Sequence, residues 1–171
     1  MGSKERRKLI EQLLIKRLDP QKGQDLAKEL GVTRQVIVKD IAILRAEGVN
    51  IIATPEGYII QKDESHKIKR IIAVSHSSEN IEEELTCVVK FGGVIEDVII
   101  EHPLYGEMRG MLMIKTLYDI QNFMKKFKEY KAEPLSALTG GVHIHTIEAA
   151  DEETMNRIIN ELKQRQYLIS D

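Results

Sequence analysis

The sequence contains a single cysteine, Cys87, so a disulfide framework within the chain is excluded and a reducing cytoplasm is the expected location. It lacks any apolar run of the length that a membrane span needs, and no signal-peptide pattern stands at its beginning. The nucleophile elbow, the phosphate-binding loop and the HExxH motif are missing as well. We therefore expect a cytoplasmic protein without a membrane partner, and we expect no enzymatic activity.

Charge is distributed unevenly along the 171 residues. Residues 1–62 contain 12 Lys and Arg against 8 Asp and Glu, whereas residues 63–171 contain 13 against 19. A basic first part and an acidic second part suggest that only the first meets a polyanion. Chance variation between two solvated surfaces is the alternative. The hydrophobic content of 42% is enough for a packed core, and the length fits one large or two small domains.

Residues 32–48, VTRQVIVKDIAILRAEG, have the pattern of the recognition helix of a helix-turn-helix. Ile37, Ile41 and Leu44 recur at helical spacing and predict one buried stripe. Thr33 is a suitable N-cap, and Gly48 is a suitable C-terminal stop. The opposite face, near the helix N-terminus, is where a recognition helix contacts base edges. The residues predicted to contact DNA are Thr33, Arg34, Gln35, Val38 and Lys39.

The flanking segments predict the winged form of this motif. Apolar residues at helical spacing predict helices over residues 4–18 and 24–30, and a turn signal at Pro55-Glu56-Gly57 predicts a hairpin over residues 49–61. Residues 1–62 are therefore expected to form a winged helix-turn-helix domain that binds double-stranded DNA. A small helical domain that binds protein, or nothing, is the alternative. The basic residues at the start of the first helix either contact phosphate or form a solvated terminus; they are Lys4, Arg6, Arg7 and Lys8.

A second domain is expected over residues 68–171, after a polar linker at residues 62–67 that contains an exposed His66. Its patterning predicts strands at residues 67–76, 94–102, 107–114 and 142–149, and helices at residues 79–91, 117–130 and 151–165. Ile71 to Val74 form an apolar run that predicts a buried strand, and PLSALTGG predicts a loop. The order β-α-β-β-α-β-α predicts a ferredoxin-like α/β sandwich, so the fold class is α+β.

Four of the five histidines lie at predicted strand ends of this domain: His76, His102, His143 and His145. His143 and His145 are two apart on one strand, so their side chains share a face. In a ferredoxin-like sheet the last strand usually runs antiparallel beside the first, which brings His76 close to them. The helix after His76 offers a carboxylate from Glu79, Glu82, Glu83 or Glu84. Three imidazoles and a carboxylate suit zinc, nickel or iron.

Each part of this cluster has a plainer alternative. A His-x-His pair on a strand is more often a surface pair than a pair of ligands, and residues 82–84 could equally form a solvated face. His102, which precedes Pro103, is expected to line a pocket rather than hold metal. The pair Gly140-Gly141 either lets a ligand approach the backbone closely or simply makes a turn.

The segments SHSSENIEEEL, EHPLYGE and GGVHIHTIE, placed after a winged helix-turn-helix, resemble the niacin-responsive transcriptional repressors that carry a C-terminal three-histidine domain. The resemblance covers nearly the whole chain. It implies a repressor of NAD synthesis, salvage or niacin uptake genes, with nicotinic acid as co-repressor and one divalent transition metal per chain, nickel or zinc or iron. Carried onto matching positions, it implies His76, Glu84, His143 and His145 as ligands. We assign His102, Gly140 and Gly141 to the effector pocket.

The leading hypothesis is thus a metal-containing, ligand-responsive DNA-binding repressor that acts as a homodimer, as readers of two half-sites usually do. A metal-dependent hydrolase with a DNA-binding appendage is the competing hypothesis, with Glu82 or Glu83 as a spare base. A third is a regulator for which the metal itself is the signal.

Overall fold

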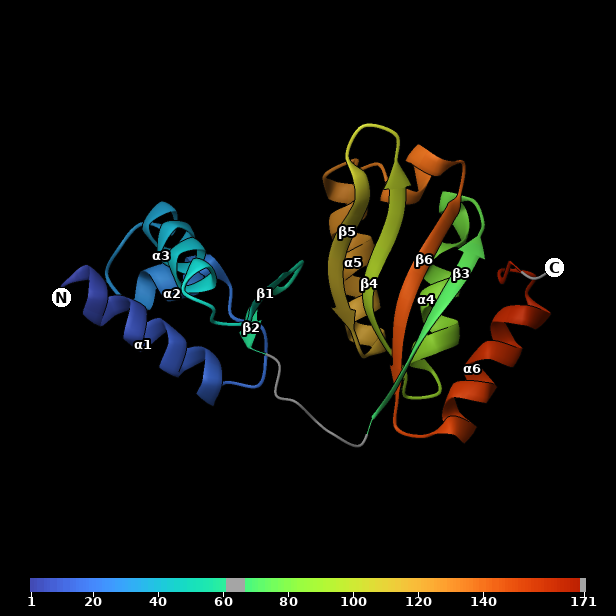
Figure 1. Cartoon of the computed structure of the whole chain (residues 1–171), viewed down its shortest axis with the longest axis horizontal. Coiled ribbons are helices and arrows are strands. Elements are labelled where there is room, and N and C mark those ends of the chain that lie inside the picture. Colours follow the sequence, from blue (N-terminus) through green and yellow to red (C-terminus); the bar gives the residue numbers. More distant parts are fainter. Residues whose placement is uncertain (61–66, 170–171) are drawn as a thin grey trace. The chain divides into compact units, whose positions relative to one another are not determined.

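The computed structural model describes residues 1–60 and 67–169, and the chain divides into two compact units, residues 1–63 and 64–171 (Figure 1). The predicted linker, with His66, lies outside the described residues except for Lys67. Among the described helices, none is long and apolar enough to cross a lipid bilayer.

The first unit contains three helices followed by a hairpin, in the order that the sequence predicts. These elements are α1 (Ser3–Lys16), α2 (Gly23–Glu29), α3 (Arg34–Ala46), β1 (Ile51–Thr54) and β2 (Gly57–Ile60). Its core is aliphatic and joins all three helices to the first strand through Ile10, Leu14, Leu26, Ala27, Ile37, Ile41, Leu44 and Ile51. A small unit of this kind is stable because each amphipathic helix buries its apolar stripe against the other two.

Helix α3 has the predicted caps and the predicted buried stripe. Oγ1 of Thr33 accepts a hydrogen bond from the backbone N–H of Val36, which satisfies one of the donors that the first turn leaves free. The helix ends before Gly48, whose φ of +95° favours glycine. On the other face, Thr33, Arg34, Gln35, Val38 and Lys39 are all exposed.

Two arginines of α1 are engaged within the protein, an outcome that the sequence did not predict. Asp40 of α3 is 2% exposed, and Nε of Arg6 lies 2.6 Å from its Oδ2. Arg7 is near the same carboxylate, with Nη1 3.9 Å from Oδ1. Neither phosphate contact nor simple solvation accounts for these two residues, because a buried carboxylate requires a charged partner. Lys4 and Lys8 remain exposed.

The hairpin is attached to the helices by its second strand. Tyr58 exchanges two backbone hydrogen bonds with Gln21, which lies between α1 and α2. At Gly57, with φ of +139°, an added Cβ would lie 2.5 Å from the Gln21 backbone, so only glycine permits this approach. The hairpin is thereby held against the helices as a wing.

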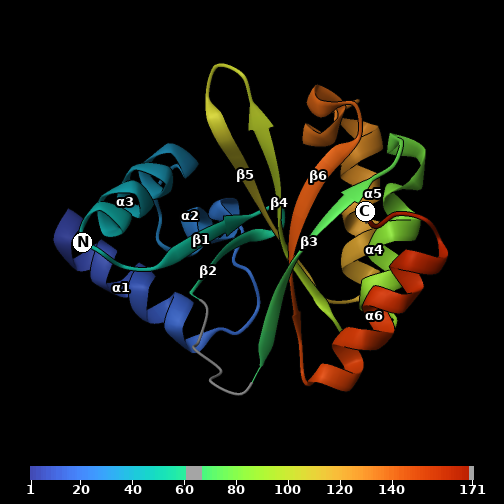
Figure 2. The same ribbon diagram turned by 45° about the vertical axis from the view of Figure 1, so that its right-hand side comes forward.

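The second unit is a four-stranded antiparallel sheet with three helices packed on one face (Figure 1 and Figure 2). Its elements are β3 (Ile68–Ser75), the 3-10 turn η1 (Ser78–Asn80), α4 (Ile81–Val89), β4 (Val94–His102), β5 (Gly106–Ile114), α5 (Leu117–Glu129), the 3-10 helix η2 (Leu135–Thr139), β6 (Val142–Ala149) and α6 (Glu152–Gln164). Between sheet and helices lies one apolar core that includes Val74, Ile147, Leu85, Ile120 and Ile158. Because η2 spans Leu135–Thr139, part of the predicted loop PLSALTGG is helical.

The strand order of this sheet differs from the ferredoxin-like prediction. The order is β3-β6-β4-β5, so the second and last strands of the unit occupy the centre. A ferredoxin-like sheet places the first and third strands there. The prediction is thus correct for the sequence of elements and for the antiparallel pairing of β3 with β6, and wrong for the arrangement of the sheet. What holds is a mixed α and β unit that follows a unit of three helices and a hairpin.

The apolar run in β3 is not buried throughout. Ile72 and Val74 face the helices, whereas Ile71, with 67% of its surface exposed, and Ala73 point to the other side. The reason is that β3 is the first strand of the sheet and its helices lie on one face only, so burial alternates along the strand. The edge of β3 that does not pair with β6 is bridged by the segment after α6, where Leu168 pairs with Val74.

Candidate metal centre

Four side chains that lie far apart in the sequence meet between β6 and α4. Nε2 of His76 is 2.6 Å from Oε2 of Glu84, and Nε2 of His143 is 3.5 Å from the same oxygen. Nε2 of His145 is 3.1 Å from the other carboxylate oxygen. All four side chains are 4% exposed or less. Three imidazoles therefore point their outer nitrogens at one buried carboxylate.

Strand register and helix position explain this convergence. Val74 and Ile72 of β3 pair with His143 and His145 of β6, so both histidines lie on the helix-covered face. His76 follows β3 at the same end of the sheet. Glu84 lies in the first turn of α4 and is 2% exposed, whereas its neighbours Glu82 and Glu83 are exposed. Of the four glutamates near this helix start, the fold thus brings only Glu84 into the cluster.

Backbone carbonyls fix the orientation of each ring. Nδ1 of His76 lies 2.8 Å from the carbonyl oxygen of Ser77, and Nδ1 of His143 lies 2.8 Å from that of Gly141. Nδ1 of His145 lies 2.5 Å from the carbonyl oxygen of Asp97. A carbonyl only accepts, so each Nδ1 carries the proton and donates it. In a neutral ring, Nε2 then carries a free lone pair. Histidines that bind metal are arranged in this way, with the other ring nitrogen donating to a backbone or side-chain acceptor.

A bulge in β4 supplies the carbonyl that holds His145. The pairing of β4 with β6 shifts register between Ile95 and Ile99, and Asp97 lies inside that irregularity. Its carbonyl turns to the imidazole of His145, while its side-chain Oδ1 accepts the backbone N–H of Thr146 at 2.8 Å. The carboxylate thereby satisfies an N–H that the ladder leaves unpaired. Asp97 is 1% exposed, and no pattern in the sequence singles it out.

The buried negative charge of Glu84 requires a positive partner. Burial alone raises the pKa of Glu84, but the charge of His145 and the hydrogen bonds of all three imidazoles outweigh it and hold this pKa well below its ordinary value. Burial lowers the pKa of His76 and of His145, and their contacts with Glu84 more than compensate, so both are raised. Protonation or a metal ion can each supply the positive charge.

Two orphaned atoms indicate which of these cations the donors fit. Oε1 of Glu84 and Nε2 of His145 are fully buried and face each other at 3.1 Å, and neither has a further hydrogen-bond partner among the described residues. Such atoms are rare in native proteins and are explained by a missing ion or water. Donor atoms of His76, Glu84 and His143 lie within 4.8 Å of one another. Together with His145, they offer three imidazole nitrogens and one carboxylate, a donor set that suits zinc, nickel and iron.

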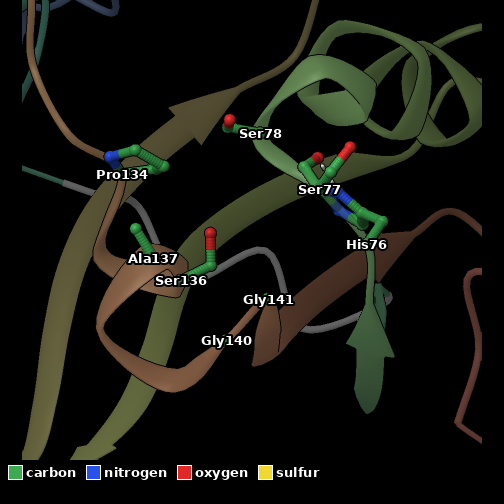
Figure 3. Close-up of a pocket in the computed structure, with 8 residues that line it drawn as sticks. All are labelled: His76, Ser77, Ser78, Pro134, Ser136, Ala137, Gly140 and Gly141. Atoms are coloured by element: carbon green, nitrogen blue, oxygen red, sulfur yellow. Dashed lines mark hydrogen bonds between the residues drawn. The ribbon is translucent and has the colours of Figure 1, made fainter.

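A cavity of about 290 Å³ lies beside the cluster (Figure 3). The connection after β3, at His76, Ser77 and Ser78, forms one wall, and the η2 segment between Pro134 and Gly141 forms the other. Gly140 and Gly141, predicted to contact an effector, both line it. His102 is not among the lining residues; its Nδ1 accepts from the backbone N–H of Leu104 and Tyr105 in the β4–β5 turn.

Tyr167 is a residue near the centre that the sequence did not reveal. Its ring lies 5.1 Å from that of His76, measured between centroids, and its hydroxyl donates to Glu83. Arg165 pairs with the same carboxylate. Glu83 is thus engaged with the end of the chain. Because Tyr167 follows the last helix and has no neighbouring motif, only the tertiary fold could place it here.

Both units of the chain match known protein families. A model of an HTH domain matches residues 5–59, and a model of the 3H domain matches residues 69–171. The chain is 50% identical over 167 residues to the probable transcription repressor NiaR of Thermotoga maritima, which covers 98% of this chain and 95% of that protein. It is 41% identical over 155 residues to the transcription repressor NadR of Bacillus subtilis, with 89% of this chain and 86% of that protein covered.

Proposed function

This chain belongs to the family of transcription repressors that join an HTH domain to a 3H domain, and from that premise we propose that it represses genes of NAD synthesis or niacin uptake. It does so by binding operator DNA with nicotinic acid as co-repressor and a transition metal in the second unit. The observation that carries this proposal is the presence, in one chain, of an exposed recognition face on α3 and a buried cluster of three histidines and a glutamate.

The DNA-binding surface is the exposed face of α3. Gln35 suits adenine through its amide, and Arg34 suits guanine or phosphate through its guanidinium. Lys39 and Val38 follow on the same face, and Thr33 caps it. The first unit is also the basic part of the chain, which favours contact with phosphate. Readers of this type bind two half-sites about 34–36 Å apart, so the active form is a homodimer.

The metal is held by His76, Glu84, His143 and His145, one divalent ion per chain. When bound, it supplies a positive charge that ties β3, α4 and β6 together. A hydrolase would need a spare base beside it, but Glu83 is bound to Tyr167 and Arg165, and Glu82 is exposed. The relatives are named repressors. We therefore assign the ion to sensing rather than to hydrolysis.

Nicotinic acid is assigned to the cavity beside His76. The cavity volume of about 290 Å³ lies just below the range of small-molecule sites, roughly 300–1,000 Å³, and suits a ligand of one ring. Gly140 and Gly141 form part of the cavity wall, which supports their proposed contact with the effector. His102, the last residue of β4, does not line this cavity, and its contact with the effector stays a prediction.

An operator titration with four samples tests this function. Metal-loaded and metal-stripped protein are each titrated with operator DNA, with and without nicotinate, at one fixed salt concentration because the phosphate contribution varies steeply with salt. We expect tight binding only with metal and nicotinate together, and neutral nicotinamide serves as the matched control ligand. A response to metal alone would instead identify a metal sensor. Equal affinity in all four samples would refute regulation by either ligand.

A further inference from the structure

Two residues of the cavity wall also orient two of the proposed metal ligands. Ser77 and Gly141 both line the cavity. The Ser77 carbonyl accepts from Nδ1 of His76, and the Gly141 carbonyl accepts from Nδ1 of His143, each at 2.8 Å. Gly141 also lies against the His76 backbone so closely that an added Cβ would be 2.5 Å from the His76 carbonyl oxygen. The backbone between cavity and cluster therefore belongs to both.

Of the four proposed ligands, His76 alone lines this cavity. Glu84, His143 and His145 are not among the residues that line it. The side chain of His76 is 2% exposed, and its Nε2 points to Glu84. A molecule in the cavity would meet the backbone of His76 and Gly141, but not the nitrogen that would hold a metal. Four protein donors already surround the site, which is the full set for a tetrahedral ion.

Polar groups in the cavity suit a carboxylate without a direct ion pair. Ser136 is 5% exposed and brings a hydroxyl to the cavity wall, while its backbone carbonyl accepts from the Thr139 hydroxyl. Figure 3 shows this hydroxyl directed from η2 into the space that faces Ser77 and Ser78. The described lining includes no Asp, Glu, Lys or Arg. A divalent ion with three neutral imidazoles and one carboxylate has a net charge of about +1, which attracts an anion through a low-dielectric wall.

We propose that this cavity is an outer-shell effector site, in which a pyridine carboxylate binds against Ser77, Ser136 and Gly141 without becoming a ligand of the metal. The inference rests on the proposed function and specifies where its effector lies. Binding there fixes the two carbonyls that orient His76 and His143, and outer-shell partners of this kind control metal affinity. Metal and effector therefore stabilise each other, by the same factor in both directions.

The first test counts donor atoms around the ion. Full-length protein loaded with zinc is examined by X-ray absorption with and without saturating nicotinate, while calorimetry reports binding of nicotinate to loaded and stripped samples. We expect nicotinate to bind, the donor shell to stay unchanged, and affinity to fall by at least about fivefold when the metal is removed. A new nitrogen or oxygen donor from nicotinate would overturn this inference alone. No binding to the loaded protein would overturn both the effector assignment and the inference.

The second test fills the cavity. Ala137 lines it on η2, and Ala137→Leu introduces a larger side chain there. Its neighbour Leu138 is 53% exposed and does not line the cavity, so Leu138→Ala is the matched control on the same element. We expect Ala137→Leu to weaken nicotinate at least about tenfold with zinc content unchanged, and Leu138→Ala to leave both unchanged. Wild-type nicotinate affinity in Ala137→Leu would contradict the location of the site.

Discussion

In the first unit the residues predicted to bind their partner lie on the exposed face of α3, whereas in the second they are buried between β6 and α4. Val38 is 41% exposed, but His143 and His145 are each 3% exposed. Around α3, the buried charge of Asp40 is paired with Arg6. Around α4, the buried Oε1 of Glu84 and Nε2 of His145 face each other at 3.1 Å and have no further hydrogen-bond partner among the described residues.

This difference separates two ways of preparing a binding site. A DNA-reading surface can leave its side chains in water, because water satisfies them until the base edges arrive. A buried metal centre has no solvating water, so its polar atoms stay unsatisfied or protonated until the ion binds. The first unit is therefore expected to fold alike with or without its ligand, and the second to depend on its ligand for stability.

The largest expected effect follows from removing two donors. In the double variant His143→Ala with His145→Ala, metal content should fall from about one ion per chain to close to none after reconstitution, because half of the donor set is lost. Elemental analysis measures this, and circular dichroism checks that the fold persists. Glu82→Ala, exposed on the same helix, is the matched control and should keep its metal. Undiminished metal in the double variant would exclude the cluster.

A second prediction concerns pH and has opposite signs for the two forms. The lowered pKa of Glu84 stabilises the metal-free fold above its ordinary value of 4.5, and this contribution is lost as pH falls through the folded pKa. The raised pKa of His76 and His145 stabilises it fully below 6.5, and that contribution is lost as pH rises through the folded values. Metal-free protein should thus be most stable between about pH 4.5 and 6.5.

Metal-loaded protein should behave in the opposite way above that range, because an imidazole must be neutral to hold an ion. The two forms are compared by the melting temperatures of stripped and loaded samples, measured in the same buffers from pH 5 to pH 8 at steps of about one pH unit. The stripped curve should fall with rising pH while the gap between the two curves widens. Curves that run parallel over the whole range would show that these side chains do not bind the ion.

A third prediction concerns the exposed site alone. Gln35→Ala should weaken operator binding by roughly 1–3 kcal/mol and relax specificity at one base pair, since a bidentate contact to adenine is lost. Metal content and melting temperature should remain unchanged because the side chain is exposed. Competition against operators with single base changes measures both affinity and specificity. If the double variant Arg34→Ala with Gln35→Ala kept its operator affinity, α3 would not be the reader.

The smallest expected effect concerns the bulge in β4. Asp97→Ala removes the oxygen that accepts the Thr146 N–H, so the carbonyl that orients His145 is less well held, and metal affinity should fall about tenfold. Asp97→Asn keeps an oxygen at that position and should retain most of the affinity. Competition with a chelator ranks the two variants. Equal losses in both would show that the charge of Asp97, rather than its acceptor, matters.

Helical and strand periodicity predicted most of the elements, because burial is decided locally where one face meets a core. The bounds of β4 and β6 agree with the predicted residues 94–102 and 142–149, and Thr33 caps α3 as expected. The meeting of His76 with His143 required one further assumption, the antiparallel pairing of first and last strands, which the structure has.

Features that depend on distant partners could not be predicted. The run Ile71 to Val74 has the same letters in a sheet covered on both faces as in a sheet covered on one, and only the packing of the helices decides which side chains are buried. Arg6 has no local sign of its pairing with Asp40, 34 positions away. The bulge at Asp97 and the contact of Tyr167 with Glu83 likewise arise from the packing of the whole unit.

The central claim is that the buried site of the second unit controls the exposed site of the first, and coupling of this kind is reciprocal. Its most direct measurement is the affinity of metal-loaded protein for nicotinate, by calorimetry, with and without saturating operator DNA at the same salt. The account predicts that operator DNA tightens nicotinate binding by about 5–150-fold, whereas a duplex of unrelated sequence tightens it much less. Equal nicotinate affinity in the presence and absence of operator would contradict it.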